Sequence, residues 1–279
     1  MKILITGSNG MLGHDLQEAL KNKHKLILTN SKTLDITDKE GVLKVICENK
    51  PDLVINSAAY TDVDGCEENP DIAYAVNGDG VKNLALACKE VDCPLLHIST
   101  DYIFNGKNDK PWVEDDEIGP ISVYGKSKLK GEQAILEILD KYFIVRTAWL
   151  YGCNGKNFPK TMLELSRNHS EITVVYDEVG SPTYTPDLAC AISQLIETDY
   201  YGIYHITNSG NCSWCEFAKY IFEVADVDVN VIPVTASEFA RPAPRPSYSV
   251  LENKNWIDKG FKPLRNYKEA IKEYIELII

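Results

Sequence analysis

The chain has 279 residues, a formal net charge of −12 and a pI near 4.9. Such an acidic chain disfavours nucleic acid or an anionic membrane as its main partner. Hydrophobic residues make up 44% of the sequence, enough for one large or two small cores. No apolar stretch approaches the roughly 20 residues that span a bilayer, and the N-terminal MKILITGSNG has no signal-peptide pattern. We therefore expect a cytoplasmic protein with no membrane partner.

The first half of the chain alternates strand-like and helix-like segments. Short aliphatic runs predict five strands, at Lys2–Thr6, Lys25–Thr29, Leu53–Ala58, Leu95–Ser99 and Phe143–Thr147. Apolar residues at helical spacing predict helices at about 11–20, 70–90 and 122–139. A further helix is predicted after Thr37 and Glu40, which form a capping box. The strands are continuously hydrophobic, as expected when helices cover both faces of a sheet. The pattern predicts an α/β fold with a Rossmann-type, doubly wound parallel sheet.

After about residue 150 the alternation of strand-like and helix-like segments becomes less regular. The segments expected there are strands at Thr173–Tyr176 and Ile203–Thr207, a helix at about 186–197 and a helix after the capping box of Ser213 and Glu216. The prolines of RPAPRP, residues 241–246, exclude helix and central strand. We expect a coenzyme-binding domain of residues 1–152 plus roughly 181–207, and a smaller C-terminal substrate-binding lobe of roughly 153–180 and 208–279.

Eight cysteines are scattered along the chain. Only Cys212 and Cys215 have C-x-x-C spacing, and no second pair of Cys or His follows to complete a zinc site. We expect reduced cysteines that serve as small core residues, and no metal site.

A glycine loop, TGSNGMLG, joins the first predicted strand to the first helix. Glycine permits the tight turn, and its missing Cβ lets a pyrophosphate approach the helix N-terminus. An ordinary glycine-rich turn is the alternative, but the position at the first strand–helix junction favours a dinucleotide.

The end of the second predicted strand bears on the choice of coenzyme. It reads Thr29-Asn30-Ser31-Lys32, with no acid before Asp35 to hold the adenosine ribose of NAD. A neutral and basic end tolerates a 2′-phosphate, which favours NADP, with NAD as the alternative if Asp35 lies near the adenosine.

Tyr124 and Lys128 follow the fourth predicted strand and share one face of a helix. Ser99, Thr100 and Asp101 end that strand, and a doubly wound sheet binds its ligands at the carboxyl ends of its strands. Reduction of a ketone needs a proton for the oxygen, which a phenol can supply when an adjacent ammonium lowers its pKa. The alternative is an exposed i,i+4 pair beside a strand-end turn. We interpret Tyr124 as proton donor, Lys128 as its partner, and Thr100 as the residue that binds the ketone oxygen.

Together, eight segments resemble the extended short-chain dehydrogenase/reductase superfamily and, within it, the dTDP-4-dehydrorhamnose reductases. They run nearly end to end: TGSNGMLG, LDITD, INSAAYTDVDGCEENPDIAYAVNGDGVKNLA, STDYIFNG, YGKSKLKGE, VRTAWLYG, SPTYTPDLA and RPSYSVLEN. The resemblance implies reduction of the 4-keto group of dTDP-6-deoxy-L-lyxo-4-hexulose with NADPH or NADH. The product would be dTDP-L-rhamnose, an activated deoxysugar for cell-surface polysaccharide.

The resemblance also implies roles for individual positions. Tyr124, Lys128 and Thr100 match the catalytic residues, and Thr100, Asp101 and Trp149 match residues that contact the sugar. The positions expected to bind the coenzyme are Gly7, Asn9, Gly10, Met11, Leu12, Asn30, Ser31, Lys32, Asp35, Ile36, Ala58, Ala59, Tyr60, Tyr124 and Lys128.

Arg241 and Arg245 are the expected diphosphate ligands in the C-terminal part. A guanidinium can chelate a diphosphate with two hydrogen bonds, and the neighbouring prolines hold the loop open; solvated loop arginines are the alternative. One departure from the family pattern lies nearby, since DEVGSPT has Glu178 where related sequences often have Gln.

Two other functions compete with this interpretation. A nucleotide-sugar 4-epimerase often has a clear acid after the second strand, and a dehydratase has an Asp-Glu pair where this chain has Asp101-Tyr102. A non-enzymatic subunit is the other alternative, because the regulatory β subunit of methionine adenosyltransferase resembles the same family. The sequence leaves a monomer or a homodimer open.

Overall fold

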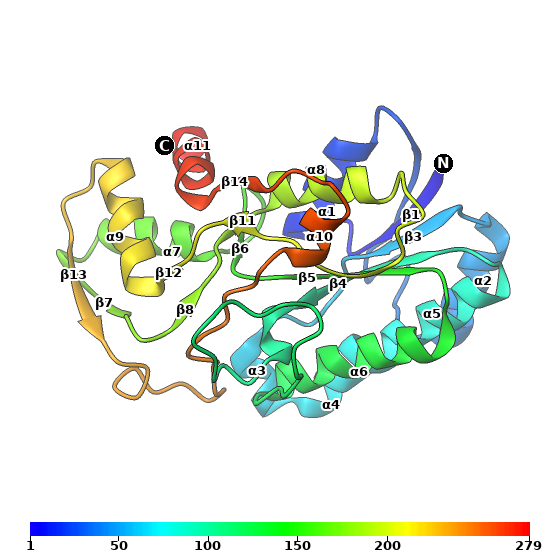
Figure 1. Cartoon of the computed structure of the whole chain (residues 1–279), viewed down its shortest axis with the longest axis horizontal. Coiled ribbons are helices and arrows are strands. Elements are labelled where there is room, and N and C mark those ends of the chain that lie inside the picture. Colours follow the sequence, from blue (N-terminus) through cyan, green and yellow to red (C-terminus); the bar gives the residue numbers. More distant parts are fainter.

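The computed structural model describes residues 1–279, and a six-stranded sheet lies at its centre (Figure 1). Its strands are β1 (Lys2–Thr6), β2 (Lys25–Leu28), β3 (Leu53–Asn56), β4 (Leu95–Thr100), β5 (Tyr142–Thr147) and β10 (Gly202–His205). They stand in the order β10-β5-β4-β3-β1-β2, and every neighbouring pair is parallel. The order reverses between β1 and β3, which opens a ligand-binding crevice at the carboxyl ends of the strands. This confirms the predicted Rossmann-type sheet.

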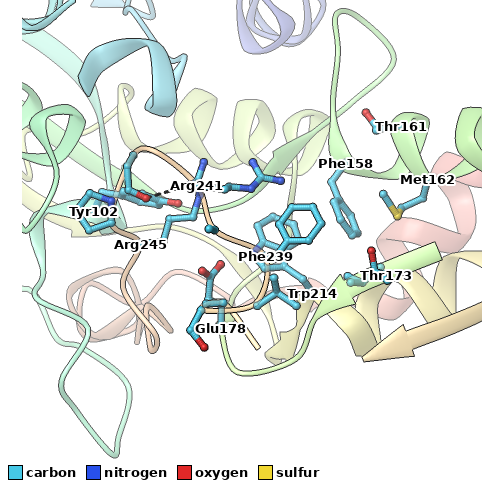
Figure 2. A pocket seen from close by; sticks show the side chains of 17 residues that line it. Tyr102, Phe158, Thr161, Met162, Thr173, Glu178, Trp214, Phe239, Arg241 and Arg245 are labelled. Carbon is cyan, nitrogen blue, oxygen red and sulfur yellow. Dashed lines mark hydrogen bonds between the residues drawn. The ribbon is translucent and has the colours of Figure 1, made fainter. Parts of the chain in front are cut away.

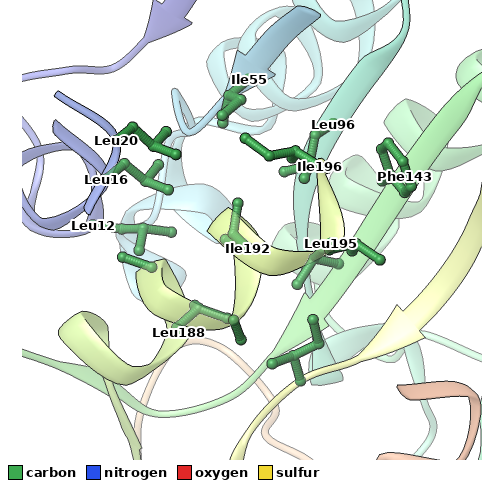
Figure 3. Packing of buried hydrophobic residues seen from close by; sticks show 14 of the residues in the cluster. Leu12, Leu16, Leu20, Ile55, Leu96, Phe143, Leu188, Ile192, Leu195 and Ile196 are labelled. Carbon is green, nitrogen blue, oxygen red and sulfur yellow. The ribbon is translucent and has the colours of Figure 1, made fainter. Parts of the chain in front are cut away.

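Helices cover both faces of the sheet (Figure 1). They are α1 (Met11–Leu20) and α8 (Thr185–Leu195) on one face, and α2 (Lys39–Asn49), α5 (Val81–Glu90) and α6 (Val123–Ile138) on the other. Figure 3 shows leucines of α1 meeting those of α8 above the strands. Ile3 and Ile5 of β1 face this core, whereas Leu4 faces the opposite one. Because successive strand residues point to opposite faces, a sheet covered on both sides needs continuously apolar strands.

The predicted helix at 70–90 is interrupted in the structure. It consists of α4 (Pro70–Tyr74), a π turn (Ala75–Gly80) and α5, and the short helix α3 (Val63–Glu68), which was not predicted, precedes it. The π turn directs the Asn77 amide to the loop after β3, where it accepts from Tyr60 N at 2.8 Å and donates to Tyr60 O at 3.0 Å. A single widened turn leaves the apolar period nearly intact, so the sequence pattern does not reveal it.

The two predicted capping boxes have different outcomes. Ser213 and Glu216 form the box, with Glu216 N donating to Ser213 Oγ and Ser213 N to the Glu216 carboxylate. The prediction at Thr37 was wrong, because Asp38 caps α2 and accepts from Gly41 N at 3.1 Å. Asp is at least as good an N-cap as Thr, and the Thr37 hydroxyl instead donates to Asp35.

The C-terminal part carries two hydrophobic clusters of its own. Its larger elements are α7 (Phe158–Ser166), β7 (Glu171–Val175), α9 (Trp214–Ala225), β13 (Asn230–Val234) and α11 (Tyr267–Ile278). The shorter ones are β6 (Leu150–Tyr151), β8 (Val179–Gly180), β9 (Thr183–Tyr184), β11 (Asn208–Ser209), β12 (Cys212–Ser213), α10 (Lys254–Asp258) and β14 (Leu264–Asn266). Trp256 of α10 packs into the core of the central sheet, although its segment falls within the lobe predicted from sequence. Residues 241–246 lie outside helices and strands, as their prolines predict.

None of the helices combines the length and apolar character needed to cross a membrane. Of the eight free cysteines, five are buried and Cys47 is partly buried. Cys153 and Cys190 are exposed, so the expectation that the cysteines are core residues was wrong for these two.

Candidate active site

Three connected cavities lie between the carboxyl edge of the sheet and the C-terminal part. We call them the glycine-loop cavity (about 370 Å³), the central cavity (about 440 Å³) and the lobe cavity (about 710 Å³). Gly10, Ser57 and Ala59 line both the glycine-loop and the central cavity. Tyr102 and Trp214 line both the central and the lobe cavity. The three spaces therefore adjoin one another, with the central cavity between the other two.

The glycine-loop cavity is shaped by the close approach of two loops. Gly7 has a φ of +66°, and a Cβ there would lie 2.7 Å from the backbone nitrogen of Ala58. No other residue fits this position without displacing the backbone. The predicted coenzyme residues that line this cavity are Gly7, Asn9, Gly10, Asn30, Ser31, Asp35, Ile36, Ala58, Ala59 and Tyr60. Met11 and Leu12 line the central cavity instead.

Asp35, the first acid after β2, lines this cavity. Asp35 Oδ1 accepts from the backbone nitrogen and the hydroxyl of Thr37, at 2.9 and 2.8 Å, which ties that oxygen to the start of α2. Asn30 Oδ1 accepts from Lys32 N at 3.0 Å. The Lys32 side chain is exposed and does not line the cavity, so the structure does not bring it to the other predicted coenzyme residues.

The central cavity brings the predicted catalytic residues together. Thr100 ends β4, and Tyr124 and Lys128 lie on the first turns of α6. Ser122 caps α6, and a Cβ on Gly125 would lie 2.2 Å from Tyr102 O, so the helix packs directly on the segment after β4. This close packing fixes the phenol and the ammonium beside the strand-end hydroxyl.

The Tyr124 side chain is half-buried, and its desolvation raises the pKa of the phenol, while a hydrogen bond with Thr100 acts in the opposite direction. The sequence-based expectation that Lys128 lowers this pKa is not met. Lys128 Nζ instead donates to Ile98 O at 2.6 Å. The phenol is thus protonated at neutral pH, the form required of an acid, but a raised pKa makes it a weaker acid than a free phenol.

Lys128 and Asp101 are the buried ionisable groups nearest to Thr100 and Tyr124. Burial lowers the pKa of Lys128 to about 8, opposed by Glu132. Burial raises the pKa of Asp101 to about 6, opposed by side-chain hydrogen bonds that include one from Thr100, at 3.0 Å. The second oxygen of the Asp101 carboxylate accepts no hydrogen bond of good geometry, although Ser249 lies close enough to lower the pKa of the carboxyl. A buried acceptor that borders a cavity is suited to a hydroxyl of a bound ligand.

Trp149 closes the side of the central cavity that faces the lobe. Its ring stacks on that of Trp214, with centroids 3.3 Å apart and planes at 5°. Trp149 has a φ of +47°, a strained conformation for a residue with a Cβ and one found most often at functional sites. Sequence reasoning missed Trp214, although the capping box at Ser213 already placed it at the first position of a helix.

The lobe cavity holds both predicted diphosphate ligands (Figure 2). Arg245 makes two hydrogen bonds to Asp64 of α3, at 3.1 and 3.0 Å, and Arg241 lies 3.6 Å from the same carboxylate. The Arg245 side chain is 13% exposed and that of Arg241 48%, so Arg245 is the more buried of the two. Asp64, which sequence reasoning missed, joins α3 to the 241–246 segment.

Glu178 also points into the lobe cavity (Figure 2). Burial raises its pKa, while Arg245 and a hydrogen bond with Trp214 act to lower it. Glu178 therefore contacts the Trp214 indole, and the Gln that related sequences often have at this position could make the same contact.

The fold and the site define the chain as a short-chain dehydrogenase/reductase-type protein: a Rossmann-type sheet with Thr, Tyr and Lys at its carboxyl edge. The chain belongs to the family described as the RmlD substrate binding domain, whose model matches residues 1–278.

Relatives match over nearly their whole length. The spore coat polysaccharide biosynthesis protein SpsK of Bacillus subtilis is 43% identical, covering 99% of this chain and 97% of its own. A dTDP-4-dehydrorhamnose reductase of Streptomyces griseus is 42% identical, covering 97% and 91%.

Two crystal structures are also similar over nearly the whole of both chains. A dTDP-4-dehydrorhamnose reductase of Clostridium acetobutylicum has a TM-score of 0.98 and 49% identity, covering 100% of this chain and 99% of its own. The enzyme of Bacillus anthracis, in complex with NADP, has a TM-score of 0.97 and 44% identity, covering 99% of each.

Proposed function

We propose that this chain is an NADPH-dependent dTDP-4-dehydrorhamnose reductase, which reduces the 4-keto group of dTDP-4-dehydro-L-rhamnose to give dTDP-L-rhamnose. The observation that carries the proposal is the meeting of Thr100, Tyr124 and Lys128 in the central cavity, between a glycine loop and an arginine-containing lobe cavity. The reductases among the relatives support it. SpsK, a spore coat polysaccharide protein, supports a place in polysaccharide biosynthesis.

The chain's residues divide the chemistry among them. NADPH, when bound, supplies the hydride that reaches C4 of the sugar. The Thr100 hydroxyl holds the ketone oxygen, and Tyr124 donates a proton to that oxygen as negative charge develops on it. Lys128, on the same helix face, holds the nicotinamide ribose beside the phenol. Asp101 offers its second oxygen to a sugar hydroxyl, and Trp149 covers the sugar.

NADPH is the proposed coenzyme because no acid directly follows β2 at the glycine-loop cavity, where the chain reads Thr29-Asn30-Ser31-Lys32. One Asp35 oxygen is committed to Thr37, while Asn30 and Ser31 are neutral groups that tolerate a 2′-phosphate. The relative bound to NADP supports the same choice.

The test is coenzyme oxidation by the purified chain with enzymatically prepared dTDP-4-keto-6-deoxy-L-sugar, in parallel with NADPH and NADH and without sugar. The proposal expects sugar-dependent oxidation that is faster with NADPH. A chain that binds coenzyme tightly but turns over neither this sugar nor its D-gluco isomer would instead be a non-enzymatic binding subunit. Reduction of the D-gluco isomer alone would replace the proposed substrate by that of another relative, a dTDP-4-keto-6-deoxy-D-glucose reductase.

Replacing Arg245 tests the proposed diphosphate site. We expect Arg245→Gln to raise KM for the sugar nucleotide by roughly 10- to 100-fold, because a charge-assisted hydrogen bond to phosphate contributes about 1.5–3 kcal/mol. The Kd for NADPH should stay near the wild-type value. Arg241→Gln is the matched comparison, and its effect should be smaller because that side chain is more exposed. An unchanged KM in Arg245→Gln would place the diphosphate elsewhere.

A further inference from the structure

A chain of buried polar side chains crosses the sheet beneath the central cavity. It runs from Thr6 of β1 through Asn56 of β3 and His97 of β4 to Lys128 of α6. Thr6 pairs with Asn56, and Asn56 with His97, as direct neighbours in the parallel ladder. None of the four residues is more than 2% exposed. Buried polar groups in such a chain must match donors to acceptors.

The orientation of the Asn56 amide is fixed by two donors. Its Oδ1 accepts from the Thr6 hydroxyl at 2.6 Å and from the backbone nitrogen of Ala58 at 3.1 Å. Reversing the amide would place its NH₂ group against the Ala58 N–H, two donors face to face. The Asn56 Nδ2 therefore points to His97 Nδ1, 2.9 Å away, and donates to it.

This donation determines which nitrogen of His97 carries the proton. Burial and the nearby Lys128 lower the pKa of His97 well below its usual value, so the ring is neutral. Since Nδ1 accepts from Asn56, the proton is on Nε2. Nε2 lies 3.4 Å from Lys128 Nζ. An ammonium has only donors to offer there, whereas a neutral amine has a lone pair that can accept the Nε2–H.

We propose that His97 is a positioning residue that favours the neutral amine of Lys128, through an Nε2–H held toward Nζ by Asn56, and so sets the pH at which Lys128 changes charge. The proposal rests on the proposed function, in which Lys128 holds the coenzyme ribose. The Asn56 amide also binds Ala58, which lines the glycine-loop cavity. The loop beside the coenzyme and the catalytic lysine are thus joined by one hydrogen-bonded chain.

Burial is the largest cause of the lowered pKa of Lys128, and the proposed His97 donor acts in the same direction. On α6 itself, Glu132 favours the ammonium of Lys128, but Arg146 of β5 pairs with Glu132 at 2.8 Å. Asp101 after β4 and Cys66 on α3 act on Tyr124, and Asn77 in the π turn is neutral. Asp79 in the π turn pairs with Lys130 at the surface, and Glu67 on α3 accepts from Val123 N at the start of α6.

Nuclear magnetic resonance of the wild-type chain labelled with ¹⁵N-histidine tests the tautomer directly. The proposal expects His97 Nε2 to carry the proton and Nδ1 to be unprotonated throughout the pH range in which the chain is folded. The opposite tautomer, or a protonated ring at neutral pH, would overturn the proposal. The signal is assigned by its loss in His97→Asn, so the test requires no activity.

The functional consequence is tested by the pH dependence of NADPH binding in His97→Asn. The Asn oxygen can still accept from Asn56, and the shorter side chain withdraws its donor from Lys128. We expect the alkaline midpoint at which NADPH affinity falls to move up by roughly one pH unit, a tenfold change in the proton affinity of Lys128. An unmoved midpoint in a folded variant that binds NADPH would overturn the proposal. If the wild-type chain did not bind NADPH, the proposed function itself would fail, and the tautomer measurement would still stand.

Discussion

Replacing Tyr124 by Phe should lower kcat by about two to four orders of magnitude, the usual contribution of general acid catalysis, while the Kd for NADPH stays near wild type. The Tyr124 phenol lines the central cavity and is protonated at neutral pH, so it can donate its proton to the sugar oxygen. Phe retains the ring, including its edge contact with Tyr102 at 5.5 Å, so only the proton donor is removed. Steady-state kinetics with NADPH and the keto-sugar, with coenzyme binding measured separately, checks both parts.

Tyr102→Phe is the matched control for Tyr124→Phe. It also removes a buried phenolic hydroxyl beside the same cavity, but it has no proposed role in proton transfer. Its kcat should fall much less. Full activity in Tyr124→Phe, or equal losses in the two variants, would contradict the assigned proton route.

Replacing Glu132 by Gln should lower the free energy of unfolding by about 3–5 kcal/mol, as expected when one partner of a buried ion pair is removed. Glu132 and Arg146 are each 1% exposed and are joined by hydrogen bonds of 2.8 to 3.3 Å. Arg146 also donates to Glu114 O, and Ser99 donates to Glu132. Gln keeps the shape but leaves the guanidinium charge without a counter-ion. Chemical denaturation of both proteins measures the difference.

Asp92→Asn serves as the comparison for Glu132→Gln, because it removes the carboxylate of an exposed pair with Lys141. That change should leave the free energy of unfolding unchanged within measurement error. A double change of Glu132 to Leu and Arg146 to Met should recover much of the lost stability, since it leaves neither charge unpaired. A loss under about 1 kcal/mol in Glu132→Gln would show that water or another group compensates Arg146.

Much of the fold follows from local patterns in the sequence. The five apolar runs of the first half became neighbouring parallel strands, and Ser213 and Glu216 formed the predicted capping box. These features depend on residues close in sequence, because the spacing of apolar side chains determines strands and helices and local polar side chains cap helix ends. Tyr124 and Lys128 could be placed at the carboxyl edge for the same reason, because the chain order of strand and helix determines which ends meet.

The features that sequence reasoning missed depend on contacts between distant segments. The pairing of Asp64 with Arg245 joins positions 181 residues apart, and the Trp149–Trp214 stack joins the end of the sheet to the lobe. The position of Lys128 Nζ was not foreseeable either, because it depends on contacts with His97 and the carbonyl of Ile98. Helical spacing identifies which residues share a face, but not which neighbours across the sheet they contact.

Hydride transfer with deuterium-labelled NADPH tests the central claim most directly. NADPH labelled on each face of the dihydronicotinamide C4 is incubated with dTDP-4-dehydro-L-rhamnose, and the product is examined by nuclear magnetic resonance. The account predicts dTDP-L-rhamnose carrying deuterium at sugar C4, from one of the two labelled coenzymes only. A product with deuterium at another carbon, or turnover that leaves C4 unlabelled with both coenzymes, would contradict the proposed reduction.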